Sequence, residues 1–384
     1  MKRIGIHEPH FIGNEINYLS KCIKDNWVST SGKYLKLFQE KIKKITKSKF
    51  AIPVLNGTIG LHLSLMLSNV KKDDEVIVPT ITFVATINAI KYVGAEPIFM
   101  DVDQYLNIDE EKCIEFIEKH TKFKKNCSIN KKTGRTIKAL IVVHTFGNAA
   151  KFEKLFLICK KRKIKLIEDA AESIGTKYIK NKFKNKHTGT IGDFGVLSFN
   201  GNKIITSGNG GVVLTNSKKD YKKANYLIDQ AKDDKINFIH HNVGFNYRLT
   251  NISAAIGLAQ LEKLDFYLRR KKNIRQYYNK KIEKIRGLDL MKTPSYARNN
   301  YWLNLLKVDQ KYVKTGAKSI IKKLNNMNYQ LRPVWYPNHL QKPYKKNFSY
   351  KINNARELIK NLICLPSGSG LKKNDIDKII KNIK

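Results

Sequence analysis

Lys203 stands in a setting that could turn a lysine into a nucleophile. It lies between the apolar runs 194–199 and 204–205, and a cluster of glycines that ends at Gly211 follows it. A wall of strand and turn would keep its amine from water, and desolvation lowers the pKa of a lysine. A lysine with a lowered pKa is a usable nucleophile, so the segment indicates a Schiff-base lysine. An ordinary lysine at a turn after a strand has the same local pattern.

A second segment could bind an anion. The short apolar stretch 50–55 reads as a strand, and it ends in Asn56, Gly57 and Thr58 before an amphipathic helix over 59–67. The first N–H groups of a helix lack partners within the helix and point outward, which suits a phosphate. Many turns between a strand and a helix look like this, so the segment is weak support when taken alone.

A third segment places two acids together. Glu168 and Asp169 follow the apolar strand 165–167, and the small residues Ala170 and Ala171 come next. One acid in such a place could cap a helix. A pair of acids followed by small residues indicates close approach to a ligand.

The second and third segments belong to a region in which strands and helices alternate, roughly residues 50–170. This order predicts an α/β fold with a mostly parallel central sheet flanked by helices, and ligands bind at the carboxyl ends of the strands in such sheets. The polar, basic stretch 122–136 is expected to be a loop. The strands are expected at 50–55, 75–79, 97–102, 138–144 and 165–167, and the helices at 59–67, 85–92, 110–120 and 152–163.

The C-terminal third predicts a smaller α+β domain. We place the boundary inside the strong helical segment that begins near Asn251, so that residues 1–255 form the large domain and residues 256–384 the small one. A chain of 384 residues is long enough for two domains. Strands are expected near 301–308 and 331–334, and helices near 316–327, 355–361 and 374–381.

The net charge of +41 suggests a nucleic-acid binder at first sight. However, only 11 of the 73 basic residues are arginine, isoleucine and asparagine are also abundant, and the Lys runs fall mostly in polar helical segments. A gene from an A/T-rich genome would produce this bias toward Lys, Ile and Asn at surface positions without any function. No helix-turn-helix, RNP-like aromatic strand or zinc finger is visible, so we expect no nucleic-acid partner. A basic field could still attract an anionic substrate.

The composition also bears on the compartment. No apolar run approaches the roughly 18 residues of a membrane-spanning helix, and the N-terminus lacks the apolar stretch of a secretory signal. The five cysteines are scattered, with no CxxC pair. We therefore expect a cytoplasmic protein with no membrane partner, no disulfide framework and no metal site.

Eight stretches carry a family resemblance when they are taken in order over residues 7–370. The sequence resembles the DegT/DnrJ/StrS aminotransferases, the pyridoxal-phosphate enzymes that aminate keto sugars on nucleotides. This resemblance implies the aspartate aminotransferase type I fold and a homodimer with two shared active sites at its interface. The stretches are WVSTSG, NGTIGLHL, PTITFVATINAI, EDAAESIG, GTIGDFGVLSFNGNKIITSGNGG, GFNYRLTNISAAIGLAQL, RPVW and LPSG.

The resemblance implies catalytic roles for Lys203 and Asp169 and a cofactor-binding role for Phe83. Lys203 matches the Schiff-base lysine, which then acts as general base and acid in the 1,3-proton shift. Asp169 matches the carboxylate that pairs with the pyridine nitrogen and keeps the ring protonated as an electron sink. Phe83 takes the place of the aromatic residue that stacks on the ring, although ordinary core packing would also explain it.

The resemblance also implies a phosphate site for the cofactor, pyridoxal 5′-phosphate. Gly57 and Thr58 would give it backbone and hydroxyl donors, and Ser198 matches a further hydroxyl that reaches the phosphate. Asn246 matches the residue that the other subunit contributes, which makes the dimer functionally necessary.

Two positions depart from the family pattern. Glu172 stands where a glutamine often lies near the phenolic oxygen of the cofactor, and a carboxylate beside a phenolate repels it unless one of them is protonated. We therefore expect Glu172 to be protonated or turned away. The glycine cluster contains Asn209, a residue type that tolerates a positive φ.

The motifs NGNKIIT, EDAAES and LPSGS look most like the branch that aminates C4 of UDP-linked 4-keto-6-deoxy-N-acetylhexosamines, in legionaminic acid-type or bacillosamine-type pathways, with L-glutamate as amino donor. GDP-perosamine-type and 3-aminating enzymes share most of these motifs and stay open. Candidate contacts to the nucleotide sugar are Trp27, Ser29, Thr30, Arg332 and His339. For His339, a purely structural role is an equal alternative.

A dehydratase of the same fold is a competing interpretation. Such relatives carry a histidine in place of the Schiff-base lysine, so Lys203 argues against it.

Overall fold

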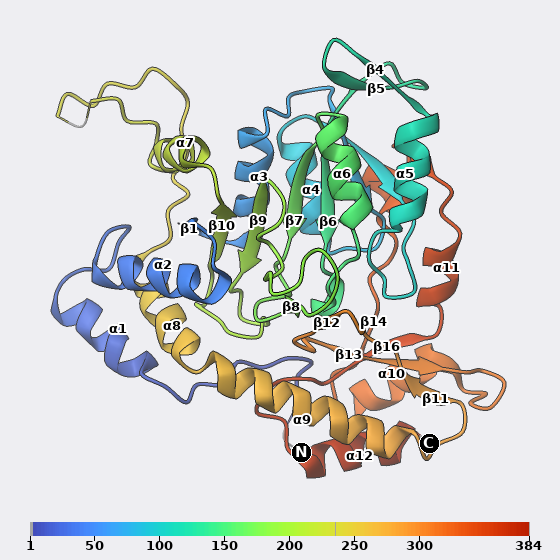
Figure 1. Ribbon diagram of the computed structural model, residues 1–384. Coiled ribbons are helices and arrows are strands. Elements are labelled where there is room, and N and C mark those ends of the chain that lie inside the picture. Colours follow the sequence, from blue (N-terminus) through green and yellow to red (C-terminus); the bar gives the residue numbers. More distant parts are fainter. Residues whose placement is uncertain (1–2, 235, 384) are drawn as a thin grey trace.

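A computed structural model describes residues 3–234 and 236–383, and a ten-stranded sheet forms its centre (Figure 1). The strands of this sheet are β1 (Phe50–Val54), β2 (Glu75–Pro79), β3 (Glu96–Met100), β4 (Thr121–Lys124), β5 (Cys127–Asn130), β6 (Thr136–Val143), β7 (Lys165–Asp169), β9 (Phe194–Ser198), β10 (Gly211–Thr215) and β15 (Ser349–Tyr350). Their order is β1-β10-β9-β7-β6-β2-β3-β15, and β5 and β4 extend from β6. The six strands from β9 to β15 run parallel, which confirms the predicted mostly parallel sheet.

Helices cover both faces of this sheet (Figure 1). Successive side chains of a strand point to opposite faces. In β9, Val196 packs in one apolar cluster with residues of α3, α4 and α7, whereas Leu197 packs in another with residues of α2 and α8. The helices are α1 (Glu15–Lys24), α2 (Lys33–Thr46), α3 (Gly57–Leu67), α4 (Val84–Tyr92), α5 (Glu110–Lys119), α6 (Glu153–Lys161), α7 (Lys218–Ile228), α8 (Asn251–Glu262) and α9 (Leu264–Ile282).

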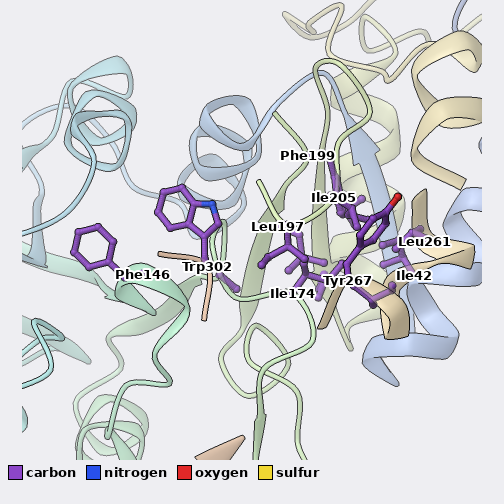
Figure 2. Packing of buried hydrophobic residues seen from close by; sticks show 14 of the residues in the cluster. Ile42, Phe146, Ile174, Leu197, Phe199, Ile205, Leu261, Tyr267 and Trp302 are labelled. Atoms are coloured by element: carbon purple, nitrogen blue, oxygen red, sulfur yellow. The ribbon is translucent and has the colours of Figure 1, made fainter. Parts of the chain in front are cut away.

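Figure 2 shows the cluster on the α2 and α8 face. Leu197 and Phe199 of the β9 region lie there with Ile42 of α2 and Leu261 of α8. The ring of Phe199 meets that of Phe38 edge-on at 5.3 Å between centroids. Ile205, two residues after Lys203, belongs to the same cluster. The turn that carries Lys203 is therefore anchored on both sides by buried apolar side chains.

The C-terminal part has a second, four-stranded antiparallel sheet, in the order β11-β13-β16-β14. The predicted boundary at 255/256 falls inside α8 and stays a prediction. Two strand pairings connect this part to the rest of the chain. Strand β15 joins the large sheet at β3, and β12 pairs with β8. The remaining elements of the chain are β8 (Lys177–Tyr178), β11 (Leu288–Leu290), β12 (Ala297–Arg298), β13 (Asn304–Val308), α10 (Gly316–Asn326), β14 (Arg332–Pro333), α11 (Asn354–Ile359), β16 (Leu362–Leu365) and α12 (Lys373–Ile383), with single 3-10 turns at Thr145–Gly147, Asn338–Leu340 and Lys342–Tyr344.

The expectation of a loop over 122–136 was wrong. Strands β4 and β5 form a hairpin there, and Lys124 lies opposite Cys127. The two residues of its turn, Lys125 and Asn126, have φ of 50° and 59°. A two-residue turn with positive φ at both positions matches the twist of a hairpin. The strongly basic composition hid this pattern, because the strand alternates lysines with a half-exposed Phe123.

Among the described residues, no helix is both long and apolar enough to cross a bilayer.

Asp101, just after β3, ties the C-terminal part to the large sheet. Its fully buried carboxylate accepts backbone N–H groups at the start of α11, from Asn353 at 3.0 Å, Asn354 at 2.8 Å and Ala355 at 2.9 Å. Lys112 of α5 donates a further hydrogen bond to it. Burial acts to raise the pKa of Asp101, but these hydrogen bonds outweigh it and hold the pKa below its usual value.

We expect Asp101→Asn to lower the free energy of unfolding at pH 7 by about 1–3 kcal/mol, since an amide oxygen accepts these bonds more weakly and a buried NH₂ is left without a partner. The folded pKa of Asp101 is depressed, so its contribution is present above the unfolded pKa and lost as pH falls through the folded one. Urea unfolding at several pH values should show the difference from wild type shrinking in acid. Glu40→Gln, which removes an exposed ion pair with Lys43, is the control and should change little. An equal difference at every pH would contradict this account.

Candidate active site

A cavity of about 840 Å³ lies at the carboxyl ends of the central strands. The turns after β1, β2, β7 and β9 reach it from the large sheet, and segments near β13 and β14 reach it from the C-terminal part. This is the place where open parallel sheets bind ligands. Eight of the residues predicted from the sequence line it, namely Gly57, Thr58, Phe83, Asp169, Glu172, Ser198, Lys203 and Arg332.

The amine of Lys203 is enclosed within this cavity, and only 12% of its side chain is exposed. Its Nζ lies 3.4 Å from Oε1 of Glu172 and 4.4 Å from the ring centroid of Trp302. The Trp302 Nε1–H donates at 2.7 Å to the carbonyl of Asn202, the residue before Lys203. Trp302 therefore contacts the ammonium and also fixes the turn that carries it.

Asp169 ends β7 and is buried at the cavity wall. Its Oδ2 accepts from Oγ1 of Thr86 at 2.7 Å, and its Oδ1 accepts from the N–H of Ala171 at 3.1 Å. Burial raises the pKa of Asp169, while the two hydrogen bonds and the charge of Lys203 oppose this effect. A cation placed beside this carboxylate would stabilise its charged form.

The neighbouring acid, Glu168, has a different surrounding. It is fully buried, and His144 lies 3.0 Å from its Oε2. His144 Nδ1 accepts the N–H of Ala150 at 3.1 Å, so Nε2 carries the proton that Glu168 accepts. Glu168 thus holds the strand end on which Asp169 stands. It also accepts three backbone N–H groups, those of Gly189, Ile191 and Gly192.

Glu172 faces the amine of Lys203. Its Oε2 accepts the N–H of Phe146 at 2.8 Å, and the residue is 5% exposed. Burial raises the pKa of Glu172 to about 7, against the lowering effect of the Lys203 charge. The side chain can therefore take up or release a proton near neutral pH, next to an amine.

The turn after β1 and the end of β9 form one cradle. Asn56 caps α3, because its Oδ1 accepts the N–H of Ile59 at 2.9 Å, and Gly57 and Thr58 stand at the start of the helix. A Cβ added to Gly57 would lie 3.0 Å from Cβ of Ser198 and 3.3 Å from its Oγ. Only glycine leaves this space open, so backbone N–H groups and two hydroxyls can converge on an anion there.

The predicted substrate turn at 27–30 does not line this cavity. It is an exposed segment, and Trp27 is 56% exposed. Asn251 holds it, donating from Nδ2 to the carbonyl of Trp27 at 2.8 Å and from its backbone N–H to the carbonyl of Ser29 at 2.6 Å. The roles of Trp27, Ser29 and Thr30 stay predictions.

His339 and Asn246 also lie outside the residues that line the cavity. His339 Nδ1 lies 2.6 Å from Oγ1 of Thr80, and burial and the nearby Arg356 lower the pKa of His339. Asn246 is exposed and forms an isolated bridge with Asp229. Their predicted roles are likewise left as predictions.

A row of aromatic rings in contact along the cavity was not predicted from the sequence. Phe146 stacks on Trp335 at 4.5 Å between centroids and on Trp302 at 6.1 Å, and Figure 2 shows the latter pair. Phe83 is 54% exposed and lies 6.2 Å from Trp335. These rings come from distant parts of the sequence, so no spacing could reveal them. The cavity also holds His7, which had no predicted role.

The residues of the cavity fit a cofactor that carries a phosphate, a protonatable ring nitrogen and a carbonyl carbon. The cradle at Gly57 and Ser198 suits the phosphate, and the buried carboxylate of Asp169 suits a ring cation. The enclosed amine of Lys203 suits the carbonyl carbon. Pyridoxal 5′-phosphate has all three groups.

Comparison with known proteins gives one consistent family. The model of the DegT/DnrJ/EryC1/StrS aminotransferase family matches residues 10–384. The putative pyridoxal phosphate-dependent aminotransferase EpsN of Bacillus subtilis is 34% identical, over 99% of this chain and 95% of its own. A GDP-perosamine synthase of Escherichia coli O157:H7 is 35% identical, over 100% and 98%. The solved DegT DnrJ EryC1 StrS aminotransferase from Brucella abortus aligns with a TM-score of 0.84 and 25% identity, over 96% and 94%, which confirms the predicted fold.

Substitution of Gly57 should test the cradle. We expect Gly57→Ala to weaken the binding of pyridoxal phosphate by roughly five- to a hundredfold, because the added methyl group would push the hydroxyl of Ser198 out of place and a lost hydrogen bond to a charged group typically costs about 1–3 kcal/mol. Titration of the cofactor-free protein, followed by absorbance, measures the affinity. Gly201→Ala is the matched control, since a Cβ there meets nothing within 4 Å. Equal affinities for both variants and the wild type would contradict the assignment.

Glu172→Gln should change the pH dependence of stability. The folded pKa of Glu172 is about 7, above its ordinary value, so the fold penalises the ionised form increasingly as pH rises from the unfolded pKa to the folded one. Glutamine cannot ionise, so we expect the variant to gain about 1–3 kcal/mol relative to wild type between pH 5 and pH 8. Urea unfolding of the cofactor-free protein measures this gain. Glu357→Gln, at an exposed position, should show none. Parallel pH profiles of Glu172→Gln and wild type would refute the raised pKa.

Proposed function

The chain belongs to the DegT/DnrJ/EryC1/StrS aminotransferase family, and from that premise we propose that it transfers the amino group of L-glutamate to C4 of a nucleotide-linked 4-keto-6-deoxy sugar. The product would be a 4-amino sugar for a surface glycan. The cofactor of this family is pyridoxal 5′-phosphate. The observation that carries the proposal is the meeting of an enclosed lysine amine, a buried carboxylate and a phosphate cradle in one cavity.

Pyridoxal phosphate, when bound, supplies an electrophilic carbonyl carbon and a ring that stores an electron pair. Lys203 would hold the cofactor covalently, and its amine would then move a proton as base and as acid. Asp169 would keep the ring nitrogen protonated. Phe83 would be the aromatic residue against the ring.

Glu172 bears on the protonation of that amine. Lys203 must be neutral before it can act as a nucleophile. The carboxyl of Glu172 lies 3.4 Å from its Nζ and has a pKa of about 7. Glu172 is therefore the group placed to share a proton with the amine, which a glutamine in its place could not do.

We also propose a homodimer in which the partner subunit's Asn246 reaches the cofactor phosphate. The loop that leads to Asn246 projects beyond α7 (Figure 1) and exposes large apolar side chains, with Ile236 85%, Phe238 71% and Val243 84% exposed. A cluster of this kind is typical of a surface that another chain covers. A cytoplasmic location agrees with five cysteines that form no disulfide among the described residues.

The nucleotide has two candidates. The motifs NGNKIIT, EDAAES and LPSGS favour a UDP-linked 4-keto-6-deoxy-N-acetylhexosamine. The relatives named GDP-perosamine synthase, 35% identical in Escherichia coli O157:H7 and in Vibrio cholerae, favour a GDP-linked sugar. A dehydratase is disfavoured because Lys203 occupies the position at which dehydratases of this fold carry histidine.

A panel of UDP-, GDP- and dTDP-linked 4-keto-6-deoxy sugars tests the proposal. Holoenzyme incubated with L-glutamate should convert at least one of them to its 4-amino product, identified by mass spectrometry and NMR. Lys203→Ala should lose at least about 10³-fold in rate, whereas Lys154→Ala, at a 60% exposed position, should keep the wild-type rate. Glutamate-independent loss of a hydroxyl, amination at C3, or no product from any sugar would overturn the proposal.

A further inference from the structure

Asn300 is a buried asparagine to which the proposed reaction assigns no task. It lies between β12 and β13, is 2% exposed, and is not among the residues that line the cavity. It is therefore not placed to touch a substrate or a cofactor. A buried amide has two N–H donors and an oxygen acceptor, and these groups need partners. The partners of Asn300 show which parts of the chain it connects.

The side chain of Asn300 joins two segments that bear on the amine of Lys203. Its Nδ2 donates to the carbonyls of Glu172 at 2.8 Å and Ile174 at 2.9 Å, and its Oδ1 accepts the N–H of Trp302 at 3.0 Å. A flipped amide would set its oxygen against the two carbonyls, so the network fixes this orientation. Glu172 and Trp302 both contact the amine, at 3.4 Å from Oε1 and 4.4 Å from the ring centroid.

The backbone of Asn300 supports the same joint. Its N–H donates to Oγ1 of Thr176 at 3.1 Å, and this hydroxyl donates to the carbonyl of Gly147 at 2.9 Å. The residue before this glycine, Phe146, donates its N–H to the carboxylate of Glu172. A Cβ added to Gly147 would overlap Oδ1 of Asn300, so the two segments approach closely. The hydrogen bonds thus lead from Asn300 back to the carboxylate that faces the amine.

Two bulky residues at this joint have a left-handed backbone. The φ of Phe146 is 56°, and that of Tyr301 is 54°. This region is costly for bulky residues, and such residues cluster at sites that require a fixed geometry. Tyr301 lies between Asn300 and Trp302, and the bond from the Trp302 N–H to the Asn300 side chain closes its turn. Lys271 holds the carbonyl of Trp302, to which its Nζ donates at 2.7 Å.

We propose that Asn300 is a positioning residue that keeps both Glu172 and Trp302 in contact with the amine of Lys203. This inference rests on the proposed function, because it concerns the amine to which that function assigns the cofactor. A misplacement of about 1 Å can lower a rate by roughly a hundredfold. The same amine serves with glutamate and with the sugar, so loss of Asn300 should slow both half-reactions. Because Asn300 does not line the cavity, substrate binding should hardly change.

Asn299→Ala is a matched control for Asn300→Ala. The Oδ1 of Asn299 accepts the N–H of Ala149 at 3.0 Å, and its Nδ2 donates to the carbonyls of Pro294 at 3.0 Å and Ala297 at 3.3 Å. Both variants therefore lose one accepted and two donated hydrogen bonds from a buried side chain. None of the three partners of Asn299 lines the cavity. The midpoints of urea unfolding should fall by similar amounts.

Single-turnover kinetics of the holoenzyme separates a positioning role from a purely structural one. Asn300→Ala should slow both half-reactions by roughly ten- to a hundredfold, with half-saturating substrate concentrations within about twofold of wild type. Asn299→Ala should match wild type. Asn300→Ser can still close the turn with the N–H of Trp302 but is too short to reach both carbonyls, so it should show an intermediate loss.

Uptake of the cofactor adds a readout that does not depend on turnover. Cofactor-free Asn300→Ala should take up pyridoxal phosphate onto Lys203 more slowly by a similar factor, followed by absorbance. Equal rates in Asn300→Ala and Asn299→Ala, a loss confined to one substrate, or wild-type rates in a folded Asn300→Ser would overturn the proposal. Failure of wild type to take up pyridoxal phosphate or to react with glutamate would instead overturn the aminotransferase assignment itself.

Discussion

The contact of one lysine amine with a carboxylate and an indole ring is the interaction on which the site depends. Glu172 comes from the end of the large sheet, and Trp302 comes from the C-terminal part. The amine of Lys203 is enclosed only when both parts are in place. The same tryptophan donates to the carbonyl of Asn202, so the turn and the amine are positioned together. This arrangement couples the docking of the two parts to the reactivity of a single nitrogen.

The parallel sheet determines which groups can meet that nitrogen. Asp169 lies opposite Val196 in the β7–β9 pairing, and Ser198 follows two residues later at the end of β9. The carboxylate proposed to pair with the ring nitrogen and a hydroxyl proposed to reach the phosphate therefore stand on neighbouring strand ends. Alternate side chains of a strand face opposite ways, so the adjacent acid, Glu168, points away from Asp169. Its carboxylate accepts hydrogen bonds from His144 and from backbone N–H groups. One strand end thus supplies both a carboxylate that lines the cavity and one that is hydrogen-bonded within the fold.

The sequence predicted those parts of the site that depend on local order. A strand followed by small residues and a helix predicted the anion turn at Gly57, and the strand end predicted Asp169. Residues that long-range packing brings to the cavity left no local signal. His7 belongs to the N-terminal segment, and Trp335 lies more than three hundred residues later, yet both line the same cavity. The hairpin at 121–130 was missed for a different reason, because the lysines that flank Phe123 in β4 gave the segment the basic composition of a loop.

The central claim is that Lys203, out of 62 lysines, carries the cofactor. Reduction of the holoenzyme with borohydride fixes the cofactor to whichever amine holds it, and peptide mass spectrometry then identifies that amine. We predict a pyridoxyl group on the peptide that contains Lys203, in proportion to bound cofactor, and a signal that disappears when Lys203 is replaced by alanine. A label that is spread over exposed lysines, or one that survives the replacement, would contradict the account.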